Sequence, residues 1–518
     1  MLNNKLGNTL SMMKTYKYIL LALVTFSFAS CFEDESTDAI NPIAEITIDE
    51  SNLQKVYNIN KNDSLIITPV VTQKNKELPL SYAWELDQEI VSVEKDFRYK
   101  GDALGTYNGR LIVSNDDGKA FYTFTLNVNS PYEYGVLVLS KDADSRPHIA
   151  FMQEPLEEGG EKKFYDENCL EKNNNDQFFA STPTDIIQTT GTLILACQGK
   201  DDDAEDGASI YLLNEKTFVM ENFIESKEYK DFKPTKLLTP QGSYEGSAYP
   251  VISADGKMYS LPTYNAVLQP SHTLTSTYAQ VGFAIGSATY NDIVVWDNEV
   301  NALVCVYNGY GPYYCGEKYL LQRDSLLTDE YYKKNFSKLN GLCTLTPIHR
   351  TSEQEKYSRL QFIAIVKGAL AIQKVIMGSF FWEAVTGSYG KYNVLDNGGF
   401  TKTAAKSYSV INETTPCVAN ATYETMLFAD GNMVKKWYYF KNDYLDKAVD
   451  LLQVGSAEAI ITSLDISEDH MKTYVAFYEP NQEGKNGSVW VFDTNSGEVL
   501  EQYNNVCYQP VKVMYKKK

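Results

Sequence analysis

The sequence predicts an all-β protein in which a small sandwich domain is followed by a β-propeller of about seven blades. Three observations predict this class. Short runs of β-branched and aromatic residues recur along the chain and are separated by Asn, Asp and Gly. Tyrosine and phenylalanine are abundant, at 38 and 23 residues, whereas Lys and Glu rarely repeat at helical spacing. An Asp-Gly hairpin also recurs in the long C-terminal part, which is typical of repeat architectures.

Residues 1–30 are typical of an export signal. Lys14 and Lys17 precede the apolar run 18–28, which is shorter than the ~20 residues that a membrane-spanning helix needs. The small residues Ala29 and Ser30 then lead directly to Cys31. This ending resembles the bacterial lipobox, which implies that Cys31 carries a lipid anchor in the outer membrane. The alternative is an ordinary signal in which Cys31 has no special role.

Residues 31–40 form a short acidic tether, with Glu33, Asp34, Glu35 and Asp38 close together. Such a charged segment is solvated and flexible. An acidic cluster directly after the lipidated cysteine resembles the surface-export signal of Bacteroidota lipoproteins. That resemblance implies a protein that faces the cell exterior, whereas a plain linker would leave it facing the periplasm.

Residues 41–130 are expected to form a small all-β sandwich, because short strand-like runs alternate with turn clusters. The expected strands cover 44–48, 65–71, 82–86, 109–113 and 121–128. The Tyr82-Ala83-Trp84 segment, the later Gly105-Thr106-Tyr107 and the turn at 115–118 resemble the polycystic-kidney-disease (PKD) type of immunoglobulin-like domain. In this sequence Glu85-Leu86-Asp87 replaces the Gly-rich turn that normally follows the tryptophan. The resemblance implies a spacer.

Residues 131–518 are expected to form the β-propeller. The segments 254–258 and 429–433 share an Ala-Asp-Gly core, and each lies between two apolar runs, which predicts a tight hairpin. Residues 487–493 and 498–500, joined by a turn at 494–497, predict the outer hairpin of a blade. At about 40–55 residues per blade, this length predicts seven blades. A pair of sandwiches is the alternative fold.

Composition and cysteine content narrow the class of protein. A formal net charge of −20 argues against binding to nucleic acid or to an anionic surface by charge alone. Eight cysteines leave an odd number besides Cys31, so at least one stays unpaired. Cys197 and Cys305 lie in apolar runs and are expected to be buried thiols, although Cys305 is close enough in sequence to Cys315 to bridge a loop.

Catalytic and metal-binding motifs do not stand out in the sequence. It contains neither a Gly-x-Ser-x-Gly nucleophile elbow nor a His-Glu-x-x-His zinc motif, and its four histidines are far apart. The acidic stretch 201–207 departs from the calcium-binding EF-hand spacing, because Asp206 stands where that loop needs Gly. We therefore expect no enzyme activity, no metal and no cofactor.

Two further segments bear on fold and binding. Residues 467–474 resemble the Asp-box of sialidase-type propellers, with Met471 in place of Gly and Tyr474 in place of Trp; the Asp-box is a structural hairpin. The loop 307–314 is rich in tyrosine and punctuated by Gly and Pro. Tyrosine suits sugar or peptide recognition because it offers a flat apolar face and a hydroxyl. The candidate ligand-binding residues are Tyr307, Tyr310, Tyr313 and Tyr314, although they could instead pack on the propeller.

The whole layout of signal, lipidated cysteine, acidic tether, PKD-like domain and long β-repeat domain resembles the PKD-like family of Bacteroidota lipoproteins. The resemblance implies a non-catalytic accessory subunit of a Sus-type nutrient importer. Its partners would be a TonB-dependent outer-membrane barrel and the lid lipoprotein of that barrel, and its cargo an oligopeptide or a glycan. Two alternatives remain, a propeller-type glycan hydrolase or lyase and a surface adhesin.

Overall fold

The computed structural model describes most of the chain from residue 42 to residue 518. The residues outside the description are 1–41, 156–159, 161, 166–167, 176, 201–204, 226–228, 230, 242–247, 263–267, 271–275, 288–289, 300, 309–314, 321, 324–338, 352–359, 369–371, 384–390, 397–399, 403–410, 440 and 442–444. The chain divides into two compact units, of which the first ends at Asn129 and the second runs from Ser130 to Lys518.

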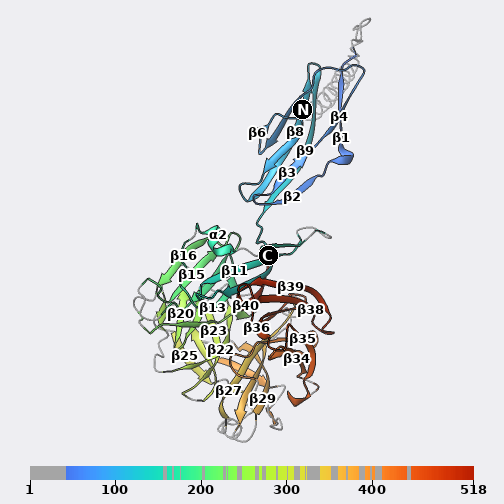
Figure 1. The fold of residues 1–518 in the computed structure, drawn as a ribbon. Helices are drawn as coiled ribbons and strands as arrows, with labels where there is room; N and C mark the ends of the chain where they lie inside the picture. Colours follow the sequence, from blue (N-terminus) through green and yellow to red (C-terminus); the bar gives the residue numbers. More distant parts are fainter. Residues whose placement is uncertain are drawn as a thin grey trace, which may run out of the picture. The chain divides into compact units, whose positions relative to one another are not determined.

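Nearly all regular structure in the described residues is β-strand, as predicted (Figure 1). The helical segments among them are the short helix α2 (Cys169–Asn173) and two 3-10 turns, Glu50–Asn52 and Leu445–Lys447. None of the helices in these residues is long and apolar enough to cross a membrane.

The first unit consists of nine strands in two layers around one core. Their bounds are β1 (Glu45–Asp49), β2 (Val56–Asn60), β3 (Ser64–Ile67), β4 (Val70–Lys74), β5 (Ser81–Leu86), β6 (Glu89–Ser92), β7 (Phe97–Lys100), β8 (Gly105–Asn115) and β9 (Gly118–Asn129). One sheet has the order β2-β9-β8-β5-β6, and the pairs β1-β4 and β3-β7 contribute side chains to the same core.

Trp84 lies at the centre of this core. Its side chain is fully buried and stacks on Phe97, with ring centroids 4.9 Å apart, while its indole N–H donates to the carbonyl of Glu94 at 3.0 Å. Gly109 stands opposite Phe124 in the β8–β9 ladder, and a Cβ at Gly109 would come within 2.3 Å of the Phe124 ring. A glycine is therefore required at this position so that the aromatic core can close.

The second unit is a series of mainly antiparallel sheets arranged around a common centre (Figure 1). The sheets have the orders β12-β11-β10-β40, β13-β14-β15-β16, β17-β19-β20-β21, β18-β22-β23-β24-β25 and β36-β37-β38-β39, and a ten-stranded sheet contains β26–β35. The bounds of the first strands are β10 (Gly135–Lys141), β11 (Pro147–Gln153), β12 (Lys163–Tyr165), β13 (Pro183–Thr189), β14 (Thr192–Cys197), β15 (Ser209–Asn214), β16 (Met220–Glu225), β17 (Pro234–Leu237), β18 (Pro240–Gln241), β19 (Ala248–Ser253), β20 (Met258–Pro262) and β21 (Gln269–Pro270).

The later strands follow the same pattern. Their bounds are β22 (Tyr278–Ser287), β23 (Tyr290–Asp297), β24 (Ala302–Asn308), β25 (Cys315–Leu320), β26 (Gln322–Arg323), β27 (Leu339–His349), β28 (Leu360–Gly368), β29 (Ile372–Glu383), β30 (Lys391–Asp396), β31 (Phe400–Lys402), β32 (Cys417–Asn420), β33 (Thr425–Asp430), β34 (Met433–Tyr438), β35 (Val449–Gln453), β36 (Ile460–Ile466), β37 (Lys472–Tyr478), β38 (Gly487–Asp493), β39 (Val499–Cys507) and β40 (Gln509–Lys516).

The strands nearest the centre form a closed cycle of neighbours. β13 contacts β40 and β17, β22 contacts β17 and β27, and β36 contacts β32 and β40, while β27 and β32 pair directly. The C-terminal strand β40 closes the cycle, because it pairs with β10 at the start of the unit. This arrangement is propeller-like and differs from the pair of sandwiches that the sequence left open.

Hydrophobic cores lie between consecutive sheets. Leu137 of β10 packs in one cluster with Leu195 of β14, and Leu427 of β33 packs in another with Val475 of β37. Sheets between two such clusters bury both faces of their inner strands, which explains why β10, β14 and β15 are continuous apolar runs, whereas the outer strand β39 alternates.

The hairpins predicted from Asp-Gly are confirmed. Gly256 lies between β19 and β20 with φ +81°, and Gly431 lies between β33 and β34 with φ +62°. These are left-handed conformations that glycine adopts without steric cost. The hairpin expected at 487–500 is confirmed as β38 and β39, the last two strands of their sheet.

The second unit begins at Ser130, one residue before the boundary expected from the sequence. The Ser130 hydroxyl donates to the carbonyl of Lys216 in the β15–β16 turn and accepts the backbone N–H of Tyr132 at 2.8 Å. Ser130 is 1% exposed, so it is a buried anchor of the second unit.

Candidate functional site

Most of the sequence-predicted site residues lie outside the described part of the chain. This holds for the lipidation residue Cys31 and for Tyr310, Tyr313 and Tyr314. Tyr307 is in β24, opposite Asp292 of β23, and its side chain is not part of the description. The lipid anchor and the tyrosine loop therefore stay predictions.

A buried charged cluster joins the central strands. Asp185 of β13 is fully buried, and its carboxylate lies 2.6 Å from the ammonium of Lys512 on β40 and 3.4 Å from that of Lys236 on β17. It also accepts the backbone N–H of Leu237 at 2.9 Å. Burial alone would raise the pKa of Asp185, but the two lysines outweigh burial and hold this pKa below its ordinary value.

The same cluster extends to the next strand through backbone groups. Asp465 of β36 accepts the N–H of Tyr515 at 2.6 Å, and the hydroxyl of Ser463 accepts the N–H of Val513 at 3.0 Å. Burial raises the pKa of Asp465. β40 is therefore held on one side by the buried carboxylate of Asp185 and on the other by the partly buried carboxylate of Asp465, which indicates a structural role at the point where the cycle closes.

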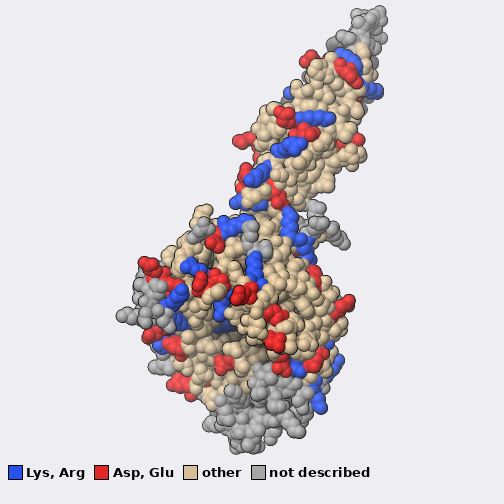
Figure 2. All heavy atoms as spheres, viewed as in Figure 1, with Lys and Arg blue, Asp and Glu red and all other residues tan. Residues whose placement is uncertain are grey.

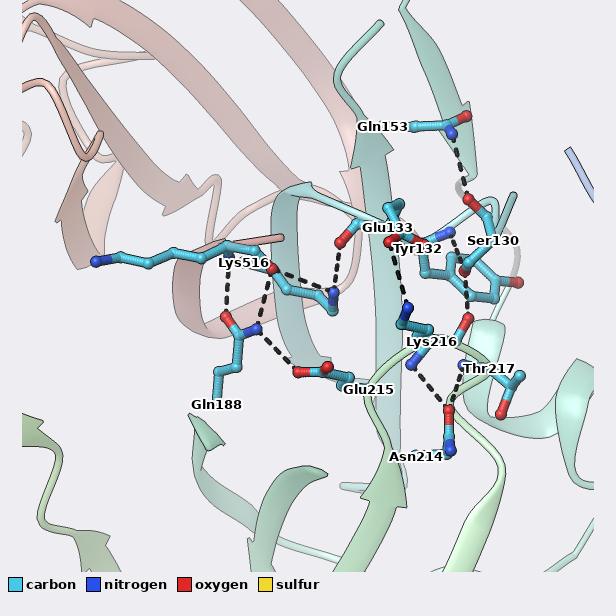
Figure 3. Close-up of polar contacts among 11 residues, drawn as sticks. Ser130, Tyr132, Glu133, Gln153, Gln188, Asn214, Glu215, Lys216, Thr217 and Lys516 are labelled. Atoms are coloured by element: carbon cyan, nitrogen blue, oxygen red, sulfur yellow. Dashed lines mark hydrogen bonds and ion pairs between the residues drawn. The ribbon is translucent and has the colours of Figure 1, made fainter. Parts of the chain in front are cut away.

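A second set of contacts secures the end of β40 (Figure 3). The ammonium of Lys516 donates to the carbonyl of Glu133 at 2.7 Å, and burial lowers the pKa of Lys516 to about 8. The amide of Gln188 on β13 pairs with the backbone of Lys517 through two hydrogen bonds, at 2.8 and 3.0 Å, and also reaches Glu215 at 3.1 Å. Lys516 and Lys517 are thus held by hydrogen bonds to the segment before β10 and to the neighbouring β13 sheet.

An open cleft of about 640 Å³ lies beside this seam. It is lined by Tyr134, Glu154, Pro155, Thr351, Ser467, Glu468, Asp469, Lys472, Tyr474 and Tyr515. One side of the cleft is formed by Tyr515 of β40 with the segments before β10 and after β11. The other side is formed by the β36–β37 turn and the first residues of β37. We name it the seam cleft.

One wall of the seam cleft is the β36–β37 turn, which the sequence analysis compared with an Asp-box. Ser467 donates its hydroxyl to Asp469 at 2.6 Å, and Asp469 accepts the N–H of Met471 at 2.9 Å. The hydroxyl of Ser467 accepts the N–H of Lys472 at 2.9 Å. The segment is therefore a hairpin turn that is stabilised by its own Ser and Asp side chains, and Asp469 has a pKa below its ordinary value.

Two histidines lie close together next to this turn. His470 is 1% exposed, and its Nδ1 lies 2.8 Å from the hydroxyl of Thr422. Burial, together with the nearby His349, lowers the pKa of His470 to about 4. Burial also lowers the pKa of His349 to about 4. The fold thus brings two of the four histidines together, as neutral groups at pH 7.

Metal chemistry has little support in the described residues. Among them, no group of three or more His, Cys, Asp and Glu side chains is arranged to hold a metal ion. In the acidic stretch 201–207, Asp206 is 4% exposed and accepts the N–H of Ser181 at 2.7 Å, so it fixes a loop. Cys197 is buried and free, as predicted.

A second hollow, of about 590 Å³, lies on the first unit over β5, β8 and β9. It is polar and contains the ion pair between Arg110 and Glu85, at 2.5 Å.

Acidic and basic side chains are interspersed over the surface seen in Figure 2, so the net negative charge is not gathered into one area of that face.

Sequence reasoning missed the seam cleft as a candidate site. Glu154, the turn at 467–472 and Tyr515 are far apart along the chain, and their proximity depends on the pairing of β40 with β10. The one available signal was the Asp-box-like segment, which identified the turn but gave no indication that a cleft lies beside it.

Comparisons with known proteins give no family. No family model matches the chain, and no curated protein matches it. Among solved structures, a quinonprotein alcohol dehydrogenase-like protein from Bacteroides thetaiotaomicron is 13% identical, with 91% of this chain and 99% of that chain covered, at a TM-score of 0.41. The dihydro-heme d1 dehydrogenase NirN is 8% identical over 75% and 76%, at 0.39, and AztD from Citrobacter koseri is 11% identical over 84% and 98%, at 0.33. At these TM-scores the likenesses carry no argument about fold or activity. The fold and the function of this chain are therefore inferred from the strand contacts and the sequence.

Proposed function

We propose that the first unit is a PKD-like sandwich and that the second is a seven-bladed β-propeller. The sandwich assignment is supported by the fully buried Trp84 and the two-layer core. The blade count is supported by the cycle of seven central strands β40, β13, β17, β22, β27, β32 and β36. In this interpretation the ten-stranded sheet contains two blades, β27–β30 and β32–β35, which are joined by a short parallel pairing.

We propose that the protein is a non-catalytic lipoprotein of the outer-membrane surface, which binds a ligand for a Sus-type nutrient importer or scaffolds that importer. Anchoring is supported by Ala29-Ser30-Cys31 and by the acidic tether that follows. The observation that supports a binding role is the seam cleft, because it lies on a closed ring of sheets that fixes its walls.

Binding rather than catalysis is supported by the state of the carboxylates in the cleft. The carboxylate of Glu154 forms an ion pair with Lys162 at 3.1 Å. The carboxylate of Asp469 accepts hydrogen bonds from the hydroxyl of Ser467 and the N–H of Met471. A general acid at neutral pH needs a raised pKa, whereas the pKa of Asp469 is lowered.

Co-purification tests the importer role. Mild detergent extraction of native membranes, followed by capture through a C-terminal tag, should recover a TonB-dependent barrel and its lid lipoprotein in stoichiometric amounts. A protein of the same membrane with an unrelated lipobox is the control. Recovery of a monodisperse monomer without any barrel would argue against the importer role.

A further inference from the structure

The chemistry of the seam cleft is unusual for a small-molecule pocket. Such pockets are mostly lined by apolar side chains, with a few polar groups. Among the described residues that line this cleft, none is an aliphatic hydrophobic residue; Tyr134, Tyr515 and Pro155 contribute exposed apolar surface, whereas Tyr474 stacks on Tyr515 and is 1% exposed. A ligand with aliphatic side chains would therefore find no matching pocket here.

The charges around the cleft are nearly balanced. Glu154 and Glu501 share the ammonium of Lys162, at 3.1 and 2.5 Å, and the exposed Glu468 lies 3.8 Å from Lys517. Burial opposes the charged form of Asp469, but the hydrogen bonds from Ser467 and Met471, and then the charge of Lys472, hold the pKa of Asp469 below its ordinary value. The lining itself holds the three carboxylates of Glu154, Glu468 and Asp469 and the one ammonium of Lys472, so the cleft offers no concentration of positive charge to an anion. Lys162 and Lys517 offset part of the negative charge from outside the lining.

The cleft offers both acceptors and donors of hydrogen bonds. The carboxylates accept, whereas the ammonium of Lys472 and the hydroxyl of Tyr515 donate; the hydroxyl of Tyr134 already donates to the carbonyl of Pro155. The phenols stay protonated at neutral pH, because burial raises the pKa of Tyr515 to about 12. A sugar hydroxyl donates one hydrogen bond and accepts up to two, so a neutral saccharide can pair with both kinds of group.

The tyrosines also present suitable ring geometry. Tyr515 is half-buried and stacks on the fully buried Tyr474, with centroids 5.7 Å apart and an interplanar angle of 11°. The hydroxyl of Tyr134 donates to the carbonyl of Pro155, which fixes this second ring at the cleft. Fixed aromatic faces suit the C–H face of a pyranose, because little conformational entropy is lost on binding.

We propose that the seam cleft binds a neutral oligosaccharide. The sugar ring lies against Tyr515 and Tyr134, and its hydroxyls bond to Glu468, Asp469 and Lys472. This inference rests on the binding role proposed above and adds the ligand class, and it places the ligand at the closure of the ring rather than on the tyrosine loop 307–314.

Calorimetry on the full chain purified in detergent tests the ligand class. The probes are maltoheptaose, xylohexaose and mannohexaose as neutral oligosaccharides, tetra-alanine and tri-lysine as peptides, and polygalacturonate as an anionic glycan. At least one neutral oligosaccharide should bind, with no binding of the peptides or the polyanion. Binding of a peptide alone, or of none of the neutral sugars, would overturn the proposal.

Variants test the place of binding. Tyr515→Ala should weaken the binding of the sugar about tenfold or more, because an aromatic anchor dominates such contacts. Tyr515→Phe, which keeps the ring, should retain most of the affinity, and Tyr438→Ala on β34, away from the cleft, is the matched control. Glu468→Gln is exposed and should weaken binding several-fold without changing the melting temperature, so it decides the matter if Tyr515→Ala does not fold. Full affinity in both Tyr515→Ala and Glu468→Gln would overturn the placement.

The two proposals fail in different ways. If the protein co-purifies with a barrel but no neutral sugar binds, the ligand class is wrong and the importer role stands. If a sugar binds at the cleft but no barrel is recovered, the importer role is wrong and the ligand class stands.

Discussion

At the scale of single residues, the most consequential contact is the buried carboxylate of Asp185 between two lysines. Lys512 belongs to the last strand, 327 residues away in sequence, and Lys236 belongs to the following sheet. Removing one member of a buried ion pair leaves an uncompensated charge, which costs about 3–5 kcal/mol of stability.

We therefore expect Asp185→Asn to be more destabilising than Lys512→Met. The first change leaves two lysines without their shared acid, and should lower the free energy of unfolding by about 3–5 kcal/mol. The second leaves Asp185 with Lys236 and two backbone N–H donors, from Leu237 and Ile186, so its cost should be smaller. Urea titrations measure both.

The pair of Lys435 and Asp450 supplies the control, because Asp450 is exposed and ion pairs at the surface contribute little. Asp450→Asn should leave the urea midpoint unchanged. If Lys512→Met proved the more harmful of the two core changes, the interpretation of Asp185 as the shared acid would be wrong.

His349 and His470 predict sensitivity to acid. Their pKa values are lowered to about 4 in the folded protein, whereas an unfolded histidine has a pKa of about 6.5. The unfolded chain therefore binds more protons between these values, and stability is lost as the pH falls from about 6.5 towards 4. Each histidine contributes up to ~1.4 kcal/mol per pH unit within this window.

Unfolding followed at several pH values from 7 to 5 measures this loss. His470→Asn removes one titrating group, and asparagine tolerates the left-handed φ of +63° at this position. The variant should lose less stability on acidification than the parent chain. Equal acid slopes in the two proteins would show that His470 does not titrate in this way.

At the scale of elements, the closure by β40 is the feature on which the second unit depends. β40 pairs with β10 and lies between β36 and β13, and its apolar residues Val513 and Met514 are buried. Loss of β40 would expose the edge of β10, whose residues 135–140 are all buried.

Truncation after Tyr508 should therefore abolish cooperative unfolding of the second unit while the first unit keeps its own transition. Scanning calorimetry and limited proteolysis measure the two units separately. Removal of the exposed Lys518 alone is the control and should have no effect. Two intact transitions after removal of β40 would show that the ring does not need this strand.

The tyrosine loop allows a second test at this scale. If Tyr310, Tyr313 and Tyr314 bind cargo, changing them to Ala should weaken binding by a few kcal/mol in total with little change in melting temperature, since a loop contributes less burial than a strand. Calorimetry with peptide and glycan libraries, beside a thermal scan of each variant, separates binding from packing. A loss of stability without a loss of affinity would identify the rings as packing residues.

Local signals explain which elements could be predicted from the sequence. The hairpins at Gly256 and Gly431 were predictable because a turn with a left-handed backbone favours glycine. The signal is local, since the Asp-Gly pair and the two apolar runs beside it lie within a few residues of each other. The Asp185–Lys512 pair was not, because nothing near either residue indicates its partner. The seam cleft was missed for the same reason, since Glu154 and Tyr515 meet only after the ring has closed.

At the scale of the whole molecule, we propose a lipid-anchored N-terminus followed by a first unit and a second unit that binds the ligand. The fold class was predictable because strand-like runs and turns recur throughout the chain. The proposed ligand class rests on contacts between residues that are distant in sequence. The proposed position in the cell rests on Cys31 and the acidic tether, which only the sequence supports.

The last prediction concerns that position. Labelled palmitate should enter the protein in growing cells, and Cys31→Ala should abolish the labelling, because the thiol of Cys31 is the proposed acylation site. Several acyl chains on one residue give firm anchoring, at about 0.8 kcal/mol for each buried methylene, so the variant should also leave the membrane fraction.

Protease added to intact cells should degrade the parent protein, and replacing the acidic residues 33–35 with Ala should protect it by retaining it on the periplasmic side. Cys197→Ala, at a buried free thiol, is the control for labelling. Complete protection of the parent protein would place it on the periplasmic side of the outer membrane and would contradict the proposal of a surface subunit.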